Sequence, residues 1–244
     1  MDRHITVCAH RGRSGLYPEN TMSAFRAAWE LNVDMIELDV ASTADGMLAV
    51  RHDRAVDRAT SGTGNIDELT GDYVKRLDAG RKKGEEFAGE RVPWLGEVLD
   101  EMPKRCRMNT HVKPFAPSVP RLVEAVVREI VDRDLLAAAY VTGDADVVRL
   151  AQEADNRIVT CNLSGQGGEG TEYIQLTREL GCTIAQPSNA IVTKEFCAAA
   201  HDAGLEVNPF YADEVGEMAR LIDCGVDGIL TNYPARLLKL LGRI

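Results

Sequence analysis

The sequence places acidic, basic and imidazole side chains where short apolar segments end. His10 and Arg11 close the segment that begins at Ile5, Glu37 and Asp39 lie within IELDV, His52 follows the Asp45-Gly46 turn, and Asn109, His111 and Lys113 close a later segment. Carboxylates bind metal ions, histidine transfers protons near neutral pH, and arginine and lysine hold phosphate. These residue types together predict metal-assisted chemistry on a phosphate-containing substrate.

Glu37 and Asp39 are expected on the same face of one strand, because side chains alternate along a strand. The other face then carries Ile36, Leu38 and Val40. Two carboxylates held close in an apolar interior repel each other and lose hydration that is worth several kcal/mol per ion. A metal ion, or the nearby Arg11 and Lys113, would offset this cost. The alternative is an ion-pair network with a purely structural role.

His10 and His52 are the candidates for general acid and general base. A single histidine is more often structural, but two histidines at predicted strand ends beside a carboxylate pair favour proton transfer. Arg11 and Lys113 suit a phosphate group, the first as a planar fork and the second as a point charge.

Eight short apolar segments alternate with helical patterns, which predicts βα units and a parallel sheet. The expected strands are Ile5–Ala9, Met35–Val40, Cys106–Val112, Ala138–Thr142, Arg157–Asn162, Cys182–Gln186, Leu205–Phe210 and Asp227–Thr231. An open doubly wound sheet is the competing fold, but it usually carries GxGxxG after its first strand, where this chain has His10-Arg11-Gly12. The glycine-rich stretch 165–170 lacks the spacing and the lysine of a P-loop and is predicted to be a flexible βα loop. The fold class is therefore α/β, a (β/α)8 TIM barrel formed by residues 1–244 as a single domain.

A small insertion, at about 44–95, interrupts the alternation after the second strand. Between the second and third strands, from Ala41 to Arg105, Met47–Arg51 is predicted to be a short strand, and Asp67–Leu77 and Trp94–Met102 are predicted helices. Because barrel enzymes carry their sites on the loops that follow the strands, this insertion is expected to form one wall of the site.

The charge balance and the hydropathy limit the partners. The net charge is −10, with 28 Lys and Arg against 38 Asp and Glu, so no nucleic acid is expected as a partner. The start of the chain, MDRHITVCAHRG, lacks the pattern of a signal peptide, and no apolar stretch approaches the roughly 18 residues of a membrane span. Six scattered cysteines without a CxxC pair suggest reduced, mostly buried thiols. These features predict a cytoplasmic protein without a stable membrane anchor, and they leave the oligomeric state open.

Two stretches carry a resemblance to a known family. AHRGRSGLYPENTMSAFRAA, followed by MIELDVASTADGMLAVRHDRAVDRATSGTG, resembles the glycerophosphodiester phosphodiesterase family, whose pattern is HRG, PENT, an acidic E-x-D strand, T-x-DG and HD, in this order. The resemblance is strongest over residues 8 to 64 and continues through VPWLGEVLDEM, MNTHVK and GVDGILTNYP, so that it covers nearly the whole chain.

The resemblance implies a (β/α)8 barrel that uses one divalent metal ion to hydrolyse a small-molecule phosphodiester to glycerol 3-phosphate and an alcohol. Glu37 and Asp39 would be metal ligands, His10 and His52 the acid–base pair, and Arg11 and Lys113 the phosphate-binding residues. The metal would be Mg or Ca by the same resemblance.

The chain departs from the family pattern at three places. The third strand usually reads Asn-x-Glu-x-Lys, where the glutamate completes the metal site, and His111 occupies this position here. If His111 is a ligand, the affinity of the site for Mn or Zn increases relative to its affinity for Mg or Ca, because imidazole suits the former metals and oxygen the latter. Asn208–Tyr211 stands for a Trp-Thr-Val-Asn run, and Asn232 stands for the aspartate of Thr-Asp-x-Pro.

These departures leave two alternatives for the function. One is a related phosphodiesterase for a lysophospholipid, with Phe115, Phe210 and Tyr211 lining an apolar groove, or for a sugar phosphodiester. The other is a non-catalytic barrel that binds a phosphate ligand.

Overall fold

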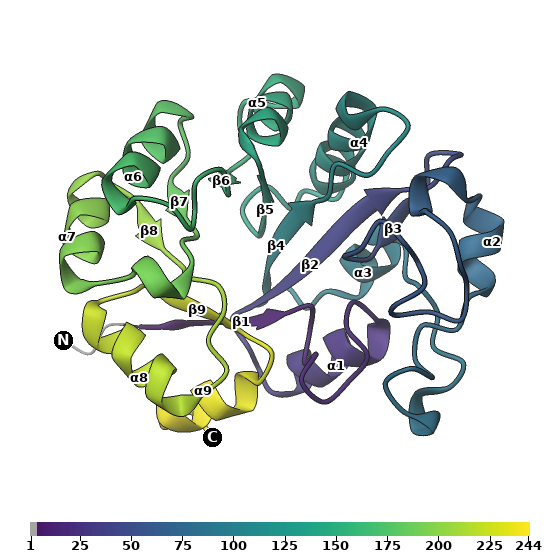
Figure 1. Ribbon diagram of the computed structural model, residues 1–244, viewed down its shortest axis with the longest axis horizontal. Coiled ribbons are helices and arrows are strands. Elements are labelled where there is room, and N and C mark those ends of the chain that lie inside the picture. Colours follow the sequence, from purple (N-terminus) through teal and green to yellow (C-terminus); the bar gives the residue numbers. More distant parts are fainter. Residues whose placement is uncertain (1–3) are drawn as a thin grey trace.

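The computed structural model describes residues 4–244 and shows a barrel of parallel strands surrounded by helices (Figure 1). The barrel strands are β1 Thr6–His10, β2 Met35–Ser42, β4 Arg107–Val112, β5 Ala139–Gly143, β6 Thr160–Asn162, β7 Ile184–Ala185, β8 Glu206–Val207 and β9 Gly228–Thr231. Their order in the sheet is β8-β7-β6-β5-β4-β2-β1-β9. Residues 1–3 of the amino-terminal segment interpreted above lie outside the described residues.

Backbone hydrogen bonds join the first and last strands of this order and close the barrel. The Asp227 N–H donates to the Val207 carbonyl at 2.9 Å, and the Leu230 N–H donates to the Pro209 carbonyl at 3.1 Å. The predicted (β/α)8 barrel is confirmed, with each of the eight predicted strands present. Strands β6, β7 and β8 are shorter than their apolar segments, because flanking residues such as Cys182 and Leu205 are buried without joining a ladder. An apolar run in the sequence therefore predicts which residues are buried better than it predicts how long the strand is.

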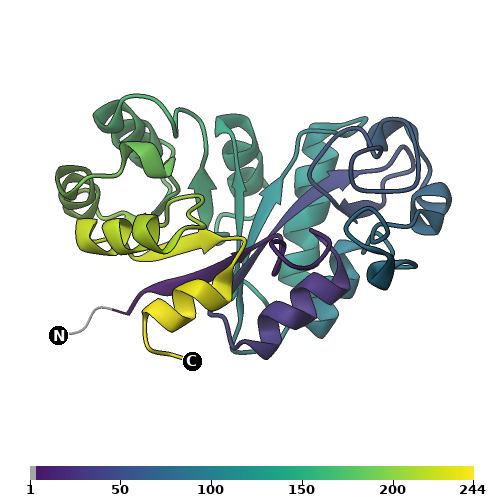
Figure 2. The same ribbon diagram turned by 60° about the horizontal axis from the view of Figure 1, so that its bottom comes forward.

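Helices cover the outside of the barrel, and Figure 2 shows them around the strands from a second direction. They are α1 Met22–Glu30, α4 Val119–Asp132, α5 Ala145–Ala154, α6 Gly170–Glu179, α7 Lys194–Asp202, α8 Val215–Cys224 and α9 Pro234–Leu240, with a short 3-10 turn η3 at Asn189–Ile191. Thr21 caps the amino terminus of α1, and its hydroxyl accepts a hydrogen bond from the Ala24 N–H. Within residues 4–244, no helix combines the length and the apolar character that a membrane crossing requires.

The main apolar core lies between the sheet and the helices. Ile36, Leu38 and Val40 of β2 belong to it, so the predicted alternation of β2 is confirmed and its two carboxylates face the lumen. A second apolar cluster lies where side chains of several strands meet, and it consists of Cys8, Met35, Tyr140, Cys161, Ile184 and Leu230, with Phe210 packed against it. All six cysteines are free thiols, and five are buried.

The insertion folds against the carboxyl end of β2. It contains β3 Leu48–Val50, which pairs antiparallel with β2, then η1 Ile66–Glu68, α2 Gly71–Arg76 and η2 Glu85–Phe87, and the barrel helix α3 Leu95–Glu101 follows it. The predicted continuous helix Asp67–Leu77 is wrong, because Leu69 and Thr70 adopt extended conformations. The Gly71 N–H donates instead to the Asp45 carboxylate at 2.9 Å, which ties α2 to the turn before β3.

Candidate active site

The loop between β1 and α1 binds both lumen carboxylates. The Arg11 N–H donates to Glu37 Oε2 at 3.0 Å, and Asn20 Nδ2 donates to Asp39 Oδ2 at 2.9 Å. Arg11 and Asn20 both adopt left-handed backbone conformations, with φ of 55° and 57°. Such conformations are strained for residues other than glycine and are common at functional sites. Gly12 follows Arg11 and packs closely against α1. A Cβ atom at position 12 would lie 2.7 Å from the Ala24 backbone, so this position requires glycine.

Glu37, Asp39 and His111 form a group with the composition of a metal site. One ligand atom from each lies within 4.8 Å of the other two. The register of β2 and β4 places Asp39 directly opposite His111, and His111 Nδ1 lies 3.2 Å from Asp39 Oδ1 and 3.9 Å from Glu37 Oε1. Asp39 Oδ1 is fully buried and accepts no hydrogen bond. A buried carboxylate oxygen without a hydrogen bond is costly, so this group fits a divalent cation.

The two carboxyl groups have opposite pKa shifts. Burial, followed by the charge of Asp39, raises the pKa of Glu37. Burial alone would also raise the pKa of Asp39, but its contact with His111 and the charges of Arg11 and Lys113 outweigh it and lower that pKa. Lys113 Nζ lies 3.8 Å from Asp39 Oδ1, and Arg11 Nε lies 3.2 Å from Asp39 Oδ2. In the absence of a metal ion, proton binding is therefore favoured at Glu37 and disfavoured at Asp39.

His10 and His52 come from different parts of the chain. His10 ends β1, and its Nε2 lies 3.8 Å from Glu37 Oε2. His52 follows β3 of the insertion, where the Arg51 N–H donates to the Asp39 carbonyl at 2.9 Å and holds the loop beside β2. Burial lowers the pKa of both imidazoles, so both are neutral at neutral pH and able to accept a proton.

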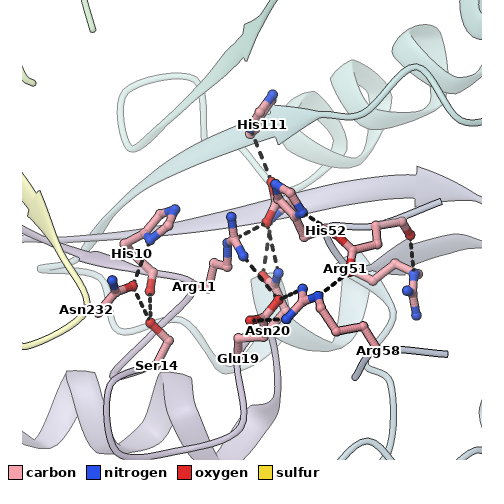
Figure 3. Close-up of polar contacts among 12 residues, drawn as sticks. His10, Arg11, Ser14, Glu19, Asn20, Arg51, His52, Arg58, His111 and Asn232 are labelled. Atoms are coloured by element: carbon pink, nitrogen blue, oxygen red, sulfur yellow. Dashed lines mark hydrogen bonds and ion pairs between the residues drawn. The ribbon is translucent and has the colours of Figure 1, made fainter. Parts of the chain in front are cut away.

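One arginine and two carboxylates connect the phosphate-binding candidate Arg11 with His52 (Figure 3). Arg11 Nη1 donates to Glu19 at 3.1 Å, Glu19 accepts two hydrogen bonds from Arg58, Arg58 also donates to Asp53, and Asp53 lies 2.7 Å from His52 Nδ1. Sequence reasoning missed Glu19, Asp53 and Arg58 as site residues. Glu19 and Asp53 lie inside the PENT and HD motifs, which was an available signal, whereas Arg58 lies in an irregular loop.

A second set of missed residues surrounds His10. Asn232 Oδ1 lies 2.8 Å from His10 Nδ1, and Ser14 Oγ donates to Asn232 Oδ1 at 2.7 Å. The Tyr211 ring stacks on the His10 ring with centroids 5.4 Å apart. Asn232 and Tyr211 lie in segments noted above as departures from the family pattern, but their contact with His10 was not predicted.

The structure brings the seven predicted site residues together at the carboxyl ends of β1, β2 and β4 and at the end of β3: His10, Arg11, Glu37, Asp39, His52, His111 and Lys113. The three aromatic residues considered for an apolar groove lie in different surroundings. Phe115 packs against the apolar cluster of the insertion, which includes Val56 and Ile66. Phe210 packs against the second apolar cluster, and Tyr211 stacks on His10. Stretch 165–170 is a loop that ends where α6 begins, as predicted.

Comparisons with known proteins identify the family of this chain and its structural relatives. The model of the glycerophosphoryl diester phosphodiesterase family matches residues 10–236. A glycerophosphodiester phosphodiesterase of Caldanaerobacter subterraneus subsp. tengcongensis is 34% identical and aligned over 96% of both chains. One from Bacillus subtilis is 30% identical over 96% of this chain and 85% of its own length.

Solved structures share the fold. A phosphodiesterase of Oleispira antarctica, determined in complex with the product sn-glycerol-3-phosphate, superimposes with a TM-score of 0.89 at 22% identity, covering 97% of this chain and 96% of its own. A glycerophosphodiester phosphodiesterase of Agrobacterium tumefaciens gives 0.84 at 23% identity, covering 96% and 99%. From the extent of the family match and the identity of the full-length relatives, this chain belongs to the glycerophosphoryl diester phosphodiesterase family.

Proposed function

We propose that this protein hydrolyses glycerophosphodiesters and releases sn-glycerol 3-phosphate and an alcohol. The observation that carries the proposal is the arrangement of two neutral histidines, His10 and His52, around the group of Glu37, Asp39 and His111. Relatives at 30–34% identity along nearly the whole chain carry the name of this activity.

Glu37, Asp39 and His111 would hold one divalent metal ion, which would act as a Lewis acid on a phosphoryl oxygen. Two carboxylates and an imidazole carry one negative charge less than three carboxylates. We therefore propose that Mn2+ or Zn2+ binds better, relative to Mg2+ or Ca2+, than it would at an all-carboxylate site.

Arg11 and Lys113 would bind the non-bridging phosphate oxygens. Arg11 is already oriented by Glu19 and Asp39, so little side-chain entropy is lost when the substrate binds. One histidine would accept the proton of the attacking hydroxyl, from water or from the glycerol of the substrate, as the new P–O bond forms. The other, after taking up a proton from solvent, would supply it to the alcohol oxygen as the old P–O bond breaks. If the glycerol hydroxyl attacks, the product is a cyclic phosphate, which water would then open to sn-glycerol 3-phosphate.

The test is turnover by protein stripped with a chelator and reconstituted separately with Mg2+, Ca2+, Mn2+ or Zn2+. Glycerophosphocholine and glycerophosphoethanolamine are the substrates, and released sn-glycerol 3-phosphate is measured. We expect release that depends on the metal and that falls at least about 10²-fold in His10→Ala and His52→Ala. His4→Ala is the matched control, because His4 is exposed and its imidazole lies beside Asp34, which is not one of the site residues.

Different failures of this test have different meanings. Release from lysophospholipids or sugar phosphodiesters alone would replace the proposed substrate with one of those classes. Binding of sn-glycerol 3-phosphate without turnover by any metal form would identify a non-catalytic barrel. Unchanged turnover in both His10→Ala and His52→Ala would remove the proposed acid–base pair.

We also propose a cytoplasmic location. The six cysteines are free thiols, as is usual for proteins of a reducing compartment. Fractionation of the host cell with antibody detection tests this proposal, and recovery from an oxidising compartment would contradict it.

A further inference from the structure

Asn232 holds its amide group in one orientation. Its Nδ2 donates to Asp213 Oδ2 at 2.7 Å, and its backbone N–H donates to Asp213 Oδ1 at 2.8 Å. The Thr231 hydroxyl donates to the same Asp213 oxygen at 3.1 Å. Because an ionised carboxylate only accepts hydrogen bonds, the NH2 group of Asn232 must face Asp213. The amide oxygen of Asn232 therefore faces the opposite direction, towards β1.

The atom of Asn232 that meets His10 is this oxygen. His10 Nδ1 and Ser14 Oγ lie 2.8 Å and 2.7 Å from Asn232 Oδ1. An amide oxygen only accepts, so the hydrogen of this bond has to be on His10 Nδ1. Figure 3 shows His10, Ser14 and Asn232 grouped in this way at one side of the site.

The remaining nitrogen of His10 faces the carboxylates. Its Nε2 lies 3.8 Å from Glu37 Oε2, and stacking against the Tyr211 ring, at an angle of 13° between the planes, fixes the plane of the imidazole. A neutral imidazole carries one hydrogen, so with Nδ1 protonated the lone pair is on Nε2. We infer that Asn232, anchored by Asp213, is a positioning residue that keeps a hydrogen on His10 Nδ1 and so makes Nε2 the atom that exchanges a proton with the reacting groups.

The effect of the Nδ1–H tautomer on catalysis rests on the proposed function, since the tautomer matters for turnover if His10 transfers a proton. In the other tautomer, Nε2 would carry the hydrogen and could not accept one. The anchoring also explains the residue type at 232. An aspartate there would place its carboxylate against that of Asp213 and would lose the donated hydrogen bond.

The tautomer is measured directly by long-range 1H–15N correlation spectra of metal-stripped protein labelled with 15N-histidine, at pH 7.5. The chain has five histidines, so the ring resonances can be assigned by substituting each in turn. We expect a pyrrole-like Nδ1 and a pyridine-like Nε2 for His10. A pyridine-like Nδ1 in the wild-type protein would overturn the inference without any variant having to fold.

Variants at the anchor test the cause. In Asn232→Leu we expect the Nε2–H tautomer to predominate and kcat to fall about 10²-fold with little change in KM. Asn65→Leu, at a half-buried asparagine of the insertion whose amide donates to Glu68, is the control and should change neither quantity. An unchanged His10 tautomer in Asn232→Leu would show that Asn232 does not determine it.

A charge swap tests the role of Asp213. Asn232→Asp alone should lose activity, whereas Asn232→Asp combined with Asp213→Asn should restore the Nδ1–H tautomer and turnover to within about tenfold of wild type. Equal activity of the single and double variants would overturn the anchoring by Asp213. The spectra need no turnover, so absence of glycerophosphodiester hydrolysis would refute the proposed function and leave the tautomer to be judged separately.

Discussion

Replacing Asn20 with glycine should destabilise the protein and weaken metal binding through Asp39. The Asn20 side chain is buried and makes two hydrogen bonds to Asp39: its Nδ2 donates to the carboxylate at 2.9 Å, and its Oδ1 accepts from the Asp39 N–H at 3.3 Å. Glycine is chosen because φ at position 20 is 57°, where alanine would add backbone strain.

The expected loss follows from these two bonds. A hydrogen bond to a charged group contributes about 1.5–3 kcal/mol, and a neutral bond about 0.5–1.5 kcal/mol, to the free energy of unfolding. Together they amount to about 2–4.5 kcal/mol. Asn32→Gly is the matched control, because Asn32 is exposed and has φ of 55°, so the backbone effect of glycine is the same. The difference between the two variants isolates the contacts of the Asn20 amide.

The free energy of unfolding is measured by urea denaturation in chelator, and metal affinity by calorimetry. We expect Asn20→Gly to lose about 2–4.5 kcal/mol relative to Asn32→Gly, and its metal Kd to rise about 10–100-fold, as is usual when a residue that orients a metal ligand is removed. A difference below about 1 kcal/mol, together with an unchanged Kd, would refute the view that Asn20 holds Asp39 in position.

Three further predictions concern charge in the site. His111→Glu should tighten Mg2+ and Ca2+ binding relative to Zn2+ in calorimetric titrations, and an unchanged ranking would argue against His111 as a ligand. Arg58→Ala should lower kcat about tenfold, because its partners Glu19 and Asp53 orient Arg11 and His52. Arg54→Ala is the control: it breaks another arginine–carboxylate pair of the insertion and should leave turnover unchanged. Because the pKa of Glu37 is raised in the fold, the native state holds a proton that the unfolded state loses above the ordinary value of 4.5. The free energy of unfolding of metal-free protein should therefore fall from about pH 5 towards the raised pKa, by at most about 1.4 kcal/mol per pH unit, and Glu37→Gln should remove that slope in denaturation series at several pH values.

The barrel and its lumen carboxylates could be predicted because they depend on short periodicities. The alternation in β2 placed Glu37 and Asp39 on the lumen face, and the order of motifs placed His10 and His52 beside them. Asn232 could not be placed against His10 in this way, because the contact joins the last barrel strand to the first across 222 positions. Such contacts depend on how the sheet closes, and periodicity within a segment carries no information about closure.

The insertion shows the same limit at short range. Its helix prediction failed at Leu69 and Thr70, where the apolar spacing continues but the backbone extends so that the Gly71 N–H can reach Asp45. Arg58 lies in a loop without regular structure, so neither its position nor its two carboxylate partners could be read from a pattern. Side chains on irregular segments are placed by specific polar contacts rather than by the period of an element.

The series Arg11, Glu19, Arg58, Asp53 and His52 constrains how this site can change during evolution. Each carboxylate in it faces two cationic or imidazole partners, so replacing one member alone removes part of the charge compensation of its neighbours. Substitutions at these positions should therefore show epistasis, in which a change that is harmful alone becomes tolerable after a partner has changed. Tolerated sequence variation here should consist of paired substitutions, one in the insertion and one in the PENT loop. The two segments would then covary, although they are separate in the chain.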